Sequence, residues 1–312
     1  MQMQMRRKKP TSLLPFGLFN WQICQLVAAS ACRSVRCSAG IMALRLFEEK
    51  EHVAAYMQYR VENPQEVINR MMDFMKPKVQ EKFNLAVDVG CGNGKGTVLL
   101  APFFDKVVGT DVSPAQLEMA LANSLCPNVT YRQCPAEELP FESSQADLVT
   151  AMTAAHWFDR PRFLTEADRV LKPNGCLALL GFTMDMELEY GNATSDLNNI
   201  CEKFYAALRP FRNPCLGSSL SKIYLDMFES CTYQYKEWND CLRVNSMVTI
   251  NSFIGMVETA TGYQELKRQD ATEAKGLSDD IRNKIMAAMQ VSSPDTELTM
   301  VVKYFYMFAR KP

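Results

Sequence analysis

Histidine is scarce in this chain, because only His52 and His156 occur among 312 residues. A metal site built on several histidines is therefore excluded. The 11 cysteines include no CxxC pair with the spacing of a zinc site. Their odd number and irregular spacing are typical of reduced thiols in a reducing compartment. We therefore expect no bound metal and a cytoplasmic location.

Acidic side chains are absent from residues 1–41, which carry six basic ones. The apolar part of this segment is interrupted by Pro15, Gly17 and polar residues, so we expect no membrane span. Two interpretations stay open. The segment is either a disordered extension ahead of a domain that starts at residue 42, or a transit peptide that would direct the chain to mitochondria.

Basic charge is also in deficit over the rest of the chain. Of the 34 Lys and Arg residues, 28 remain in residues 42–312 beside all 35 acidic residues, a net charge of −7. A nucleic-acid-binding face needs an excess of Lys and Arg, so this composition disfavours a nucleic-acid partner.

Strand-like and helix-like segments alternate from residue 85 onward, which predicts a parallel α/β sheet with helices on both faces. In such a sheet the ligand crevice lies at the carboxyl ends of the strands. The predicted strands are Leu85–Val89, Lys106–Gly109, Val129–Gln133, Asp147–Met152 and Cys176–Phe182, and the predicted helices are Gly96–Phe103, Ser113–Asn123 and Pro161–Leu171.

This alternation lapses after Phe182. Residues 183–230 are interpreted as a helical cap inserted over the crevice, within one domain that spans residues 42–312. Beyond the cap, the β-branched and aromatic composition of Tyr233–Val244 and Glu297–Phe308 predicts strands. A helix is predicted between them, at Thr249–Thr261. A further helical pattern, Phe47–Lys76, precedes the first strand.

Glycines at alternate positions, 90, 92, 94 and 96, follow the first predicted strand. A P-loop is excluded, because the required Gly-Lys-Ser/Thr reads Gly94-Lys95-Gly96 here. A dinucleotide loop of the form GxGxxG is weakened, because its third glycine falls on Lys95 or Thr97.

S-adenosylmethionine fits the loop better than either alternative. Asp88, at the end of the first strand, suits the ammonium of the cofactor's amino-acid tail, and bare glycine backbone lets the tail lie across the turn. Asp111 ends the second strand 19 residues past Gly92, where its carboxylate would accept the ribose hydroxyls. A dinucleotide site shares the ribose acid, so Asp88 and the GxGxG spacing carry the preference.

Four motifs resemble those of the class I S-adenosylmethionine-dependent methyltransferases: "VDVGCGNGKGT", "GTDVSPAQLEMA", "AEELPF" and "LKPNG". Two more, "AMTAAHWFD" and "YMQYR", resemble the small-molecule branch that includes trans-aconitate methyltransferase. The resemblance covers residues 47–182. It implies a Rossmann-like sheet of seven strands, mostly parallel with the last antiparallel.

The resemblance also implies roles for individual residues. The methionine part of the cofactor would lie on Gly90, Gly92 and Gly94, the ribose on Asp111 and the adenine against Val112. Ala136 and Glu137 would lie near the adenine edge, after Pro135, where many members have an acid. The residues that would close over the cofactor's carboxylate or the substrate are Tyr56, Tyr59 and Arg60.

The implied activity is methyl transfer from S-adenosylmethionine to a small molecule, with O-methylation of a carboxylic acid as the finer hypothesis. His156 is then a general base, a group that orients substrate or a hydrogen-bonding core residue, and Trp157 is a pocket wall. In the cap, Arg209 and Arg212 are candidates for binding an acidic substrate.

Two alternative functions stay open. One is a methyltransferase acting on protein or nucleic acid, although "AMTA" stands where an "NPPY"-like tetrapeptide would follow the fourth strand. The other is a cofactor-binding protein without catalytic activity. The sequence leaves the oligomeric state open.

Overall fold

The computed structural model describes residues 59, 64–75, 82–216 and 219–312. The predicted extension 1–41, Tyr56 and Arg60 lie outside these residues.

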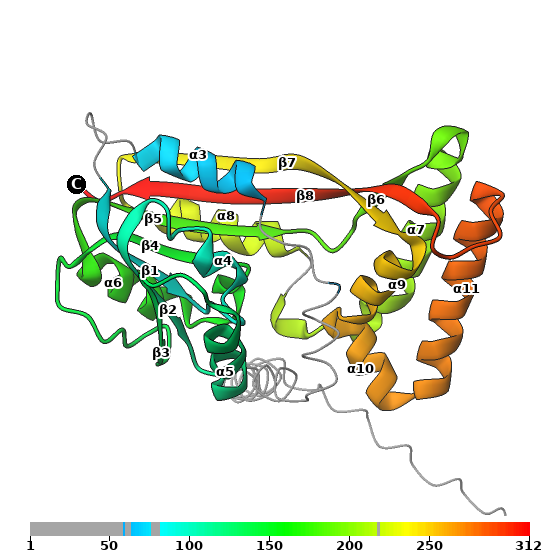
Figure 1. The fold of residues 1–312 in the computed structure, drawn as a ribbon, viewed down its shortest axis with the longest axis horizontal. Coiled ribbons are helices and arrows are strands. Elements are labelled where there is room, and N and C mark those ends of the chain that lie inside the picture. The colour runs from blue at the N-terminus through cyan, green and yellow to red at the C-terminus, as the bar shows by residue number, and fades with distance from the viewer. Residues whose placement is uncertain (1–58, 60–63, 76–81, 217–218) are drawn as a thin grey trace, which may run out of the picture. The chain divides into compact units, whose positions relative to one another are not determined.

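A mixed sheet of eight strands forms the centre of the described residues (Figure 1). Its order is β3-β2-β1-β4-β5-β8-β6, with β7 also paired to β8. The strands β1 to β5 run parallel, and β8 runs antiparallel to β5, β6 and β7, which confirms a mostly parallel sheet that ends antiparallel. The strands are β1 (Phe83–Val89), β2 (Phe104–Asp111), β3 (Val129–Gln133), β4 (Ala146–Met152), β5 (Leu171–Phe182), β6 (Glu187–Glu189), β7 (Tyr235–Thr249) and β8 (Glu297–Arg310).

Both faces of this sheet are buried, which explains why its central strands are continuous apolar runs. Along β1, Ala86 faces one hydrophobic cluster, whereas Leu85, Val87 and Val89 face the other. The first cluster is completed by helices α3 (Gln65–Met75), α7 (Thr194–Leu208), α9 (Ile250–Glu258), α10 (Thr261–Gln269) and α11 (Ala271–Met289). The second is completed by α6 (Arg160–Val170) and α8 (Leu220–Ser230). The prediction of helices on both faces is confirmed.

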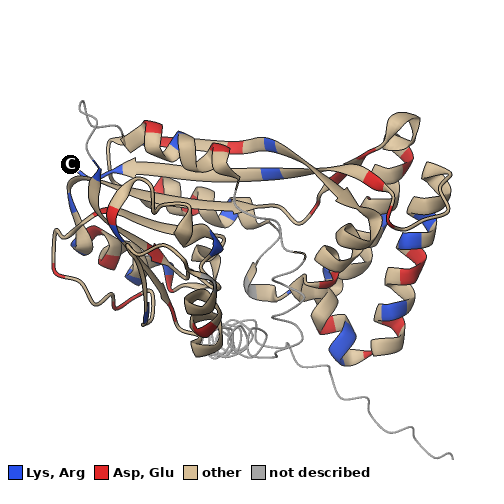
Figure 2. Cartoon of the chain, in the orientation of Figure 1, with Lys and Arg blue, Asp and Glu red and all other residues tan. Residues whose placement is uncertain are grey.

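The long strands β7 and β8 carry a second group of helices. Figure 1 shows α7, α9, α10 and α11 gathered on the right, where β7 ends and the antiparallel β8 begins. Both signs of charge alternate along α11 (Figure 2), where Lys275 and Arg282 pair with Asp279, and Lys284 pairs with Asp280. The cap at residues 183–230 stays a prediction. Its last predicted segment forms α8, which packs on the sheet.

Local differences from the predicted elements have backbone causes. Strand β5 begins at Leu171, five residues before the predicted Cys176. In its ladder with β4, Leu171 pairs with Ala146, and the next pair is Cys176 with Leu148. The four residues 172–175 therefore form a bulge, in which Asn174 has a φ of 65°. The predicted helix Gly96–Phe103 is shortened to α4 (Lys95–Val98). Helix α5 (Pro114–Asn123) starts as predicted, with Ser113 as its N-cap.

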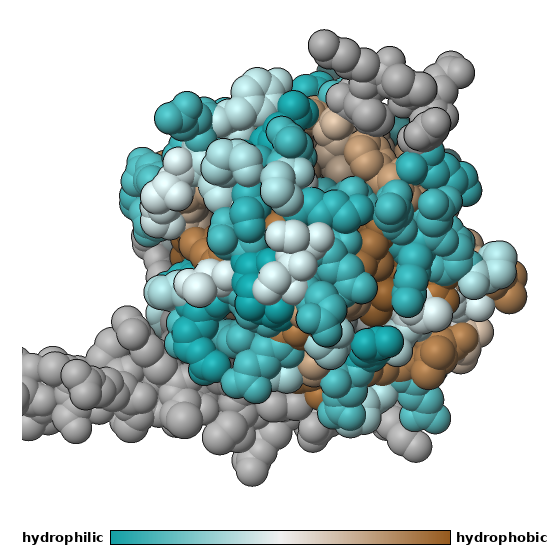
Figure 3. All heavy atoms as spheres, turned by 90° about the vertical axis from the view of Figure 1, so that its left-hand side faces the viewer, coloured by the Kyte–Doolittle hydropathy of each residue, from teal (hydrophilic) through white to brown (hydrophobic). Residues whose placement is uncertain are grey.

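The surface over α6 is mainly hydrophilic. Figure 3 views the left-hand side of Figure 1 and shows brown, hydrophobic side chains only in separate small groups on that face. Buried Phe163, Ala167 and Val170 turn the apolar stripe of α6 onto the sheet. In the described part of the chain, no helix combines the length and apolar character that a bilayer crossing requires.

Candidate cofactor site and adjoining pocket

The glycine loop joins β1 to α4 in a backbone conformation that favours glycine. Gly90, Gly92 and Gly94 have φ values of 69°, 54° and 79°, in the left-handed region. A Cβ atom at Gly90 would lie 2.6 Å from the Cβ of Ala154, and one at Gly94 would collide with the Tyr131 hydroxyl. The loop is therefore held close to the turn after β4 and to β3.

Asp111 connects this loop to the start of α5. Its Oδ2 accepts a hydrogen bond from the backbone N–H of Gly92 at 2.9 Å, and its Oδ1 accepts one from Ser113 at 2.8 Å. Burial raises the pKa of Asp111, and the N–H groups of Ser113 and Gly92 oppose that rise. Each carboxylate oxygen keeps a second lone pair, so the oriented carboxylate can still accept ribose hydroxyls.

Asp88 is a buried acid with one unsatisfied oxygen. It is 1% exposed, and its Oδ2 accepts a hydrogen bond of 2.6 Å from the Thr97 hydroxyl. Its Oδ1 has no hydrogen-bond partner in the structure as described. Burial raises the pKa of Asp88 to about 7; Thr97 lowers it, and the charge of Asp111 adds to the rise. A buried carboxylate is costly without a counter-charge, and the ammonium of an S-adenosylmethionine tail would supply one.

The residues assigned to the adenine side lie after β2 and β3. Val112 is 43% exposed although it is apolar, and it directly follows Asp111. Ala136 is buried. The Oε1 atom of Glu137 accepts a hydrogen bond of 2.7 Å from the backbone N–H of Asp159, which ties this segment to the start of α6. An adenine contact by these three residues stays a prediction.

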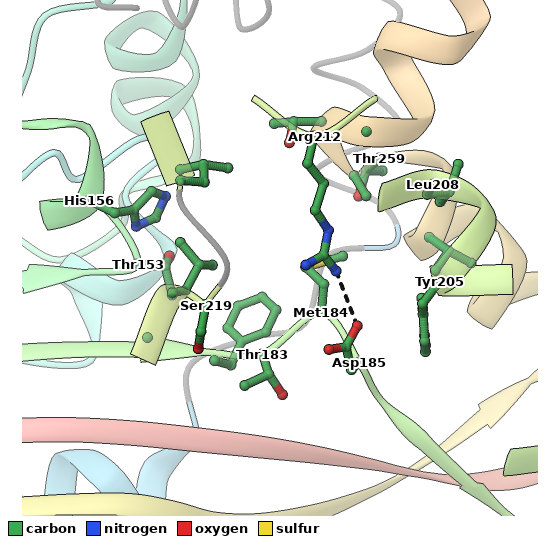
Figure 4. A pocket seen from close by; sticks show the side chains of 18 of the residues that line it. Thr153, His156, Thr183, Met184, Asp185, Tyr205, Leu208, Arg212, Ser219 and Thr259 are labelled. Atoms are coloured by element: carbon green, nitrogen blue, oxygen red, sulfur yellow. Dashed lines mark hydrogen bonds and ion pairs between the residues drawn. The ribbon is translucent and has the colours of Figure 1, made fainter. Parts of the chain in front are cut away.

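A cavity of about 150 Å³ lies at the turn that follows β4 (Figure 4). Asp88 of β1 is in register with Thr150 of β4, so the turn that follows β4 lies beside the glycine loop. That turn supplies one wall. Segments after β5, α7, α9 and the start of α8 supply the others. The lining residues are Thr153, His156, Trp157, Gly181–Asp185, Tyr205, Leu208, Arg212, Leu216, Ser219, Leu220, Val257 and Thr259–Gly262.

Three of the predicted substrate residues line this cavity: His156, Trp157 and Arg212. Arg209 is exposed and is not among the lining residues. Tyr59 instead packs on α9, where a Cβ at Gly255 would lie 2.7 Å from its ring.

The cavity also contains residues that sequence reasoning missed, of which Thr153 has the clearest structural signature. It has a φ of 60°, which is costly for a β-branched side chain. Its N–H donates to Leu180 O at 2.8 Å, and its hydroxyl donates to Met152 O at 2.7 Å. Backbone strain of this kind clusters at functional sites.

The charged groups of the cavity form an ion pair. Nη2 of Arg212 lies 3.1 Å from Oδ1 of Asp185 (Figure 4). Among the described lining residues, Arg212 is the only Lys or Arg. Within the described ranges, no group of three or more His, Cys, Asp or Glu side chains is placed to hold a metal ion.

Comparison with known proteins gives matches to methyltransferases. Residues 87–179 match a methyltransferase domain family. A Dictyostelium discoideum protein named as a methyltransferase is 28% identical over 239 residues, 74% of this chain and 83% of its own length. A Saccharomyces cerevisiae protein named as an S-adenosylmethionine-dependent methyltransferase is 29% identical over 130 residues, but the alignment covers only 40% of this chain and 43% of the yeast protein.

The fold has a counterpart among solved structures. A protein from Anaeromyxobacter dehalogenans, described as a type II methyltransferase, superposes with a TM-score of 0.66 at 21% identity, over 81% of this chain and 98% of its own. At that identity the likeness concerns the fold. The domain match supports S-adenosylmethionine as the cofactor, and its contacts with Asp88, the glycine loop and Asp111 stay a prediction.

Cofactor binding is expected to weaken as the pH falls below 7. The pKa of Asp88 lies at about 7 in the folded chain, so acid protonates its carboxyl, and a neutral carboxyl does not pair with an ammonium. Below this pKa the association constant should fall about tenfold per pH unit, measured by calorimetry between about pH 5 and pH 7. The matched variant Asp88→Asn should bind weakly and without pH dependence there. Wild-type affinity that stays constant across this range would contradict the role of Asp88.

Replacing Asp111 is expected to remove most cofactor affinity. Hydrogen bonds to a charged group contribute about 1.5–3 kcal/mol each, so Asp111→Ala should weaken binding by at least about a hundredfold. Calorimetric titration with S-adenosylmethionine measures this, and Asp105→Ala, at an exposed position of the same strand, is the control. An unchanged dissociation constant in Asp111→Ala would disprove the ribose assignment.

Proposed function

Because the chain is an S-adenosylmethionine-dependent methyltransferase, we propose that it methylates a carboxylate oxygen of a small organic acid. The observation that carries the proposal is the position of Arg212 in a cavity lined by Thr153, His156 and Trp157 of the turn after β4, a turn that also contacts Gly90 through Ala154. The sequence resembles the branch that includes trans-aconitate methyltransferase, an enzyme whose acceptor is a small carboxylic acid.

The walls of the cavity combine apolar side chains with one cation. Phe182, Leu208 and Val257 contribute apolar surface, and Arg212 contributes a planar fork of N–H donors. Asp185 contacts that fork through Nη2, so other donors remain to bind a carboxylate. The pair with Asp185 also orients the guanidinium before an acceptor binds.

The size of the cavity supports a small acceptor. A cavity of about 150 Å³ can hold a molecule of roughly the size of benzene. A side chain of a folded protein or a flipped nucleobase would need a wide entrance, and the acidic balance of residues 42–312 disfavours a nucleic acid.

The free thiols of the described cysteines support a cytoplasmic location as part of the same proposal.

In the proposed reaction, residues of the chain position the acid and the cofactor, and none of them transfers a proton. When bound, S-adenosylmethionine supplies a methyl group on a positively charged sulfur, which an anionic oxygen accepts by in-line displacement. Arg212 would hold the acid, Asp88 and Asp111 would hold the two ends of the cofactor, and Trp157 and Phe182 would exclude water. Alignment of two reactants contributes about 7–11 kcal/mol to lowering a barrier. A carboxylate needs no base, which suits a chain with two histidines.

The acceptor class is tested by transfer of tritiated methyl groups from S-adenosylmethionine to a panel of small organic acids and to a cell extract. We expect label in small molecules that mild base releases as methanol, because carboxyl methyl esters hydrolyse. Base-stable label in small molecules would indicate an N-, S- or phenol acceptor. Label confined to macromolecules, or binding of the cofactor without any transfer, would support one of the two alternative functions.

Arg212 and Arg209 provide a matched pair of variants. Arg212→Gln should raise the KM for the acid by about tenfold to a hundredfold, because it removes a charge-assisted hydrogen bond. Arg209→Gln, three positions away and exposed, should leave KM unchanged. The affinity for S-adenosylmethionine should be the same in both variants. Equal kinetics of the two variants would refute a role for Arg212 in acceptor binding.

A further inference from the structure

The ion pair in the cavity leaves both of its partners with unused hydrogen-bonding capacity. Oδ1 of Asp185 accepts a hydrogen bond of 3.1 Å from Nη2 of Arg212, and both side chains line the cavity. Oδ2 of Asp185 has no hydrogen-bond partner among the described residues. Figure 4 shows this second oxygen on the side of the carboxylate that faces Thr153 and Ser219. The cavity therefore offers N–H donors and a carboxylate acceptor side by side.

The backbone around Asp185 is fixed on two sides. The N–H of Thr183 donates to the carbonyl of Lys303 at 3.1 Å, which continues the pairing of β5 with β8. The hydroxyl of buried Tyr205 on α7 accepts from the N–H of Met186 at 3.2 Å and donates to the Met186 carbonyl at 3.3 Å. Because the chain is tied to the core before and after Asp185, its carboxylate has a defined place at the cavity wall.

The stem of Arg212 is also held in place. A Cβ atom at Gly262, in the first turn of α10, would lie 3.6 Å from Cγ of Arg212. The stem therefore passes over a glycine while the guanidinium pairs with Asp185. Since the fold positions both charged groups before a ligand arrives, a ligand that contacts both loses less affinity to the ordering of side chains.

The charges at the cavity limit the chemistry of an acceptor. Arg212 and Asp185 cancel each other, and the carboxylate of the acceptor offsets the positive sulfur of bound S-adenosylmethionine. A second carboxylate would be repelled by Asp185, and an ammonium group would add a positive charge to a site that already holds a guanidinium and a sulfonium. A hydroxyl adds no charge and can donate to Oδ2 of Asp185, and hydrogen bonds to an ionised group are the strong ones.

We propose that the acceptor is a hydroxy acid with a single carboxylate, whose hydroxyl donates to Asp185 while the carboxylate binds Arg212. Because Asp185 and Arg212 are in contact, the hydroxyl must lie on the carbon next to the carboxyl carbon or on the one after it. The inference rests on the proposed function, since it assumes that a carboxylate is methylated. Asp185 then determines specificity and takes no part in the chemistry.

The reaction balances without any change at the hydroxyl. One carboxylate oxygen forms a bond to the methyl carbon while the carbon–sulfur bond breaks, and the products are a neutral ester and a neutral thioether. The hydroxyl keeps its proton throughout and is not methylated. Its hydrogen bond to Asp185 thus selects the acceptor and fixes its orientation.

Matched four-carbon acids test the proposal, with methanol released by mild base as the readout. Butanoate, 2-hydroxybutanoate, 3-hydroxybutanoate and butanedioate differ in the group that Asp185 would meet. With the wild-type protein, at least one hydroxy acid should have a kcat/KM about tenfold above that of butanoate, because it gains a hydrogen bond to a charged group. Equal values for butanoate and both hydroxy acids, or a preference for butanedioate, would overturn the proposal.

Variants of Asp185 show whether this residue reads the hydroxyl. In Asp185→Ala the ratio of kcat/KM between hydroxy acid and butanoate should fall to about one. The ratio is taken within one variant, so a change in folding or in the position of Arg212 affects both substrates alike. Asp185→Asn removes the negative charge and should raise kcat/KM for butanedioate relative to butanoate by about tenfold.

Glu202→Ala, at an exposed position of α7, is the control and should keep the wild-type ratios. A hydroxyl preference that persists in Asp185→Ala would show that another group reads the hydroxyl and would overturn the role of Asp185.

Failure of the proposed function would give a different result. If the wild-type protein labels no acid in a base-labile form, the carboxylate acceptor is wrong and the hydroxy acid falls with it. If acids are labelled without a preference for a hydroxyl, the acceptor class stands and this inference alone is lost. Base-stable label on the hydroxy acids alone would mean that the hydroxyl itself is methylated, which contradicts both.

Discussion

The hydrogen bond between the backbone N–H of Gly92 and Oδ2 of Asp111, 2.9 Å long, is the contact on which the site depends. It joins the ends of β1 and β2 and requires a turn in which Gly90, Gly92 and Gly94 all have positive φ. The same turn brings Gly90 against Ala154, which follows β4. One loop therefore orients the carboxylate of Asp111 and contacts the turn after β4, from which Thr153, His156 and Trp157 line the cavity. The active geometry follows from three neighbouring parallel strands.

The site contains local costs that a ligand would offset. Asp88 is buried with one oxygen unsatisfied, and Thr153 has a left-handed backbone. Each feature opposes folding, since a desolvated carboxyl and a strained backbone both raise the free energy of the native state. An ammonium at Asp88 would turn the first of these costs into binding specificity. The scaffold tolerates them because its two hydrophobic clusters enclose the sheet on both faces.

The sequence singled out Asp88, the glycine loop and Asp111, which the structure brings together, but it indicated few of the residues that line the cavity. Asp88, the glycines and Asp111 belong to short segments in which strand, turn and helix signals follow each other directly, and β3 matched its predicted bounds. The acceptor cavity instead joins the turn after β4 to segments near residues 205 and 259, which only the folded chain brings together. The contact between His156 and Tyr224 spans 68 residues, and no spacing rule indicates it. The added strand β6 likewise depends on its pairing with the far end of β8.

A crystal structure of the protein with S-adenosylhomocysteine, the demethylated cofactor, would test how the cofactor lies in the glycine loop. We expect the ribose hydroxyls on Asp111, the amino group at Oδ1 of Asp88 directly or through one water, and the sulfur facing the cavity beside Thr153 and His156. Such a complex would show that one loop joins the cofactor site to the acceptor cavity. A ligand bound away from the glycine loop, or with its sulfur directed away from the cavity, would show that the loop and the cavity do not form one active site.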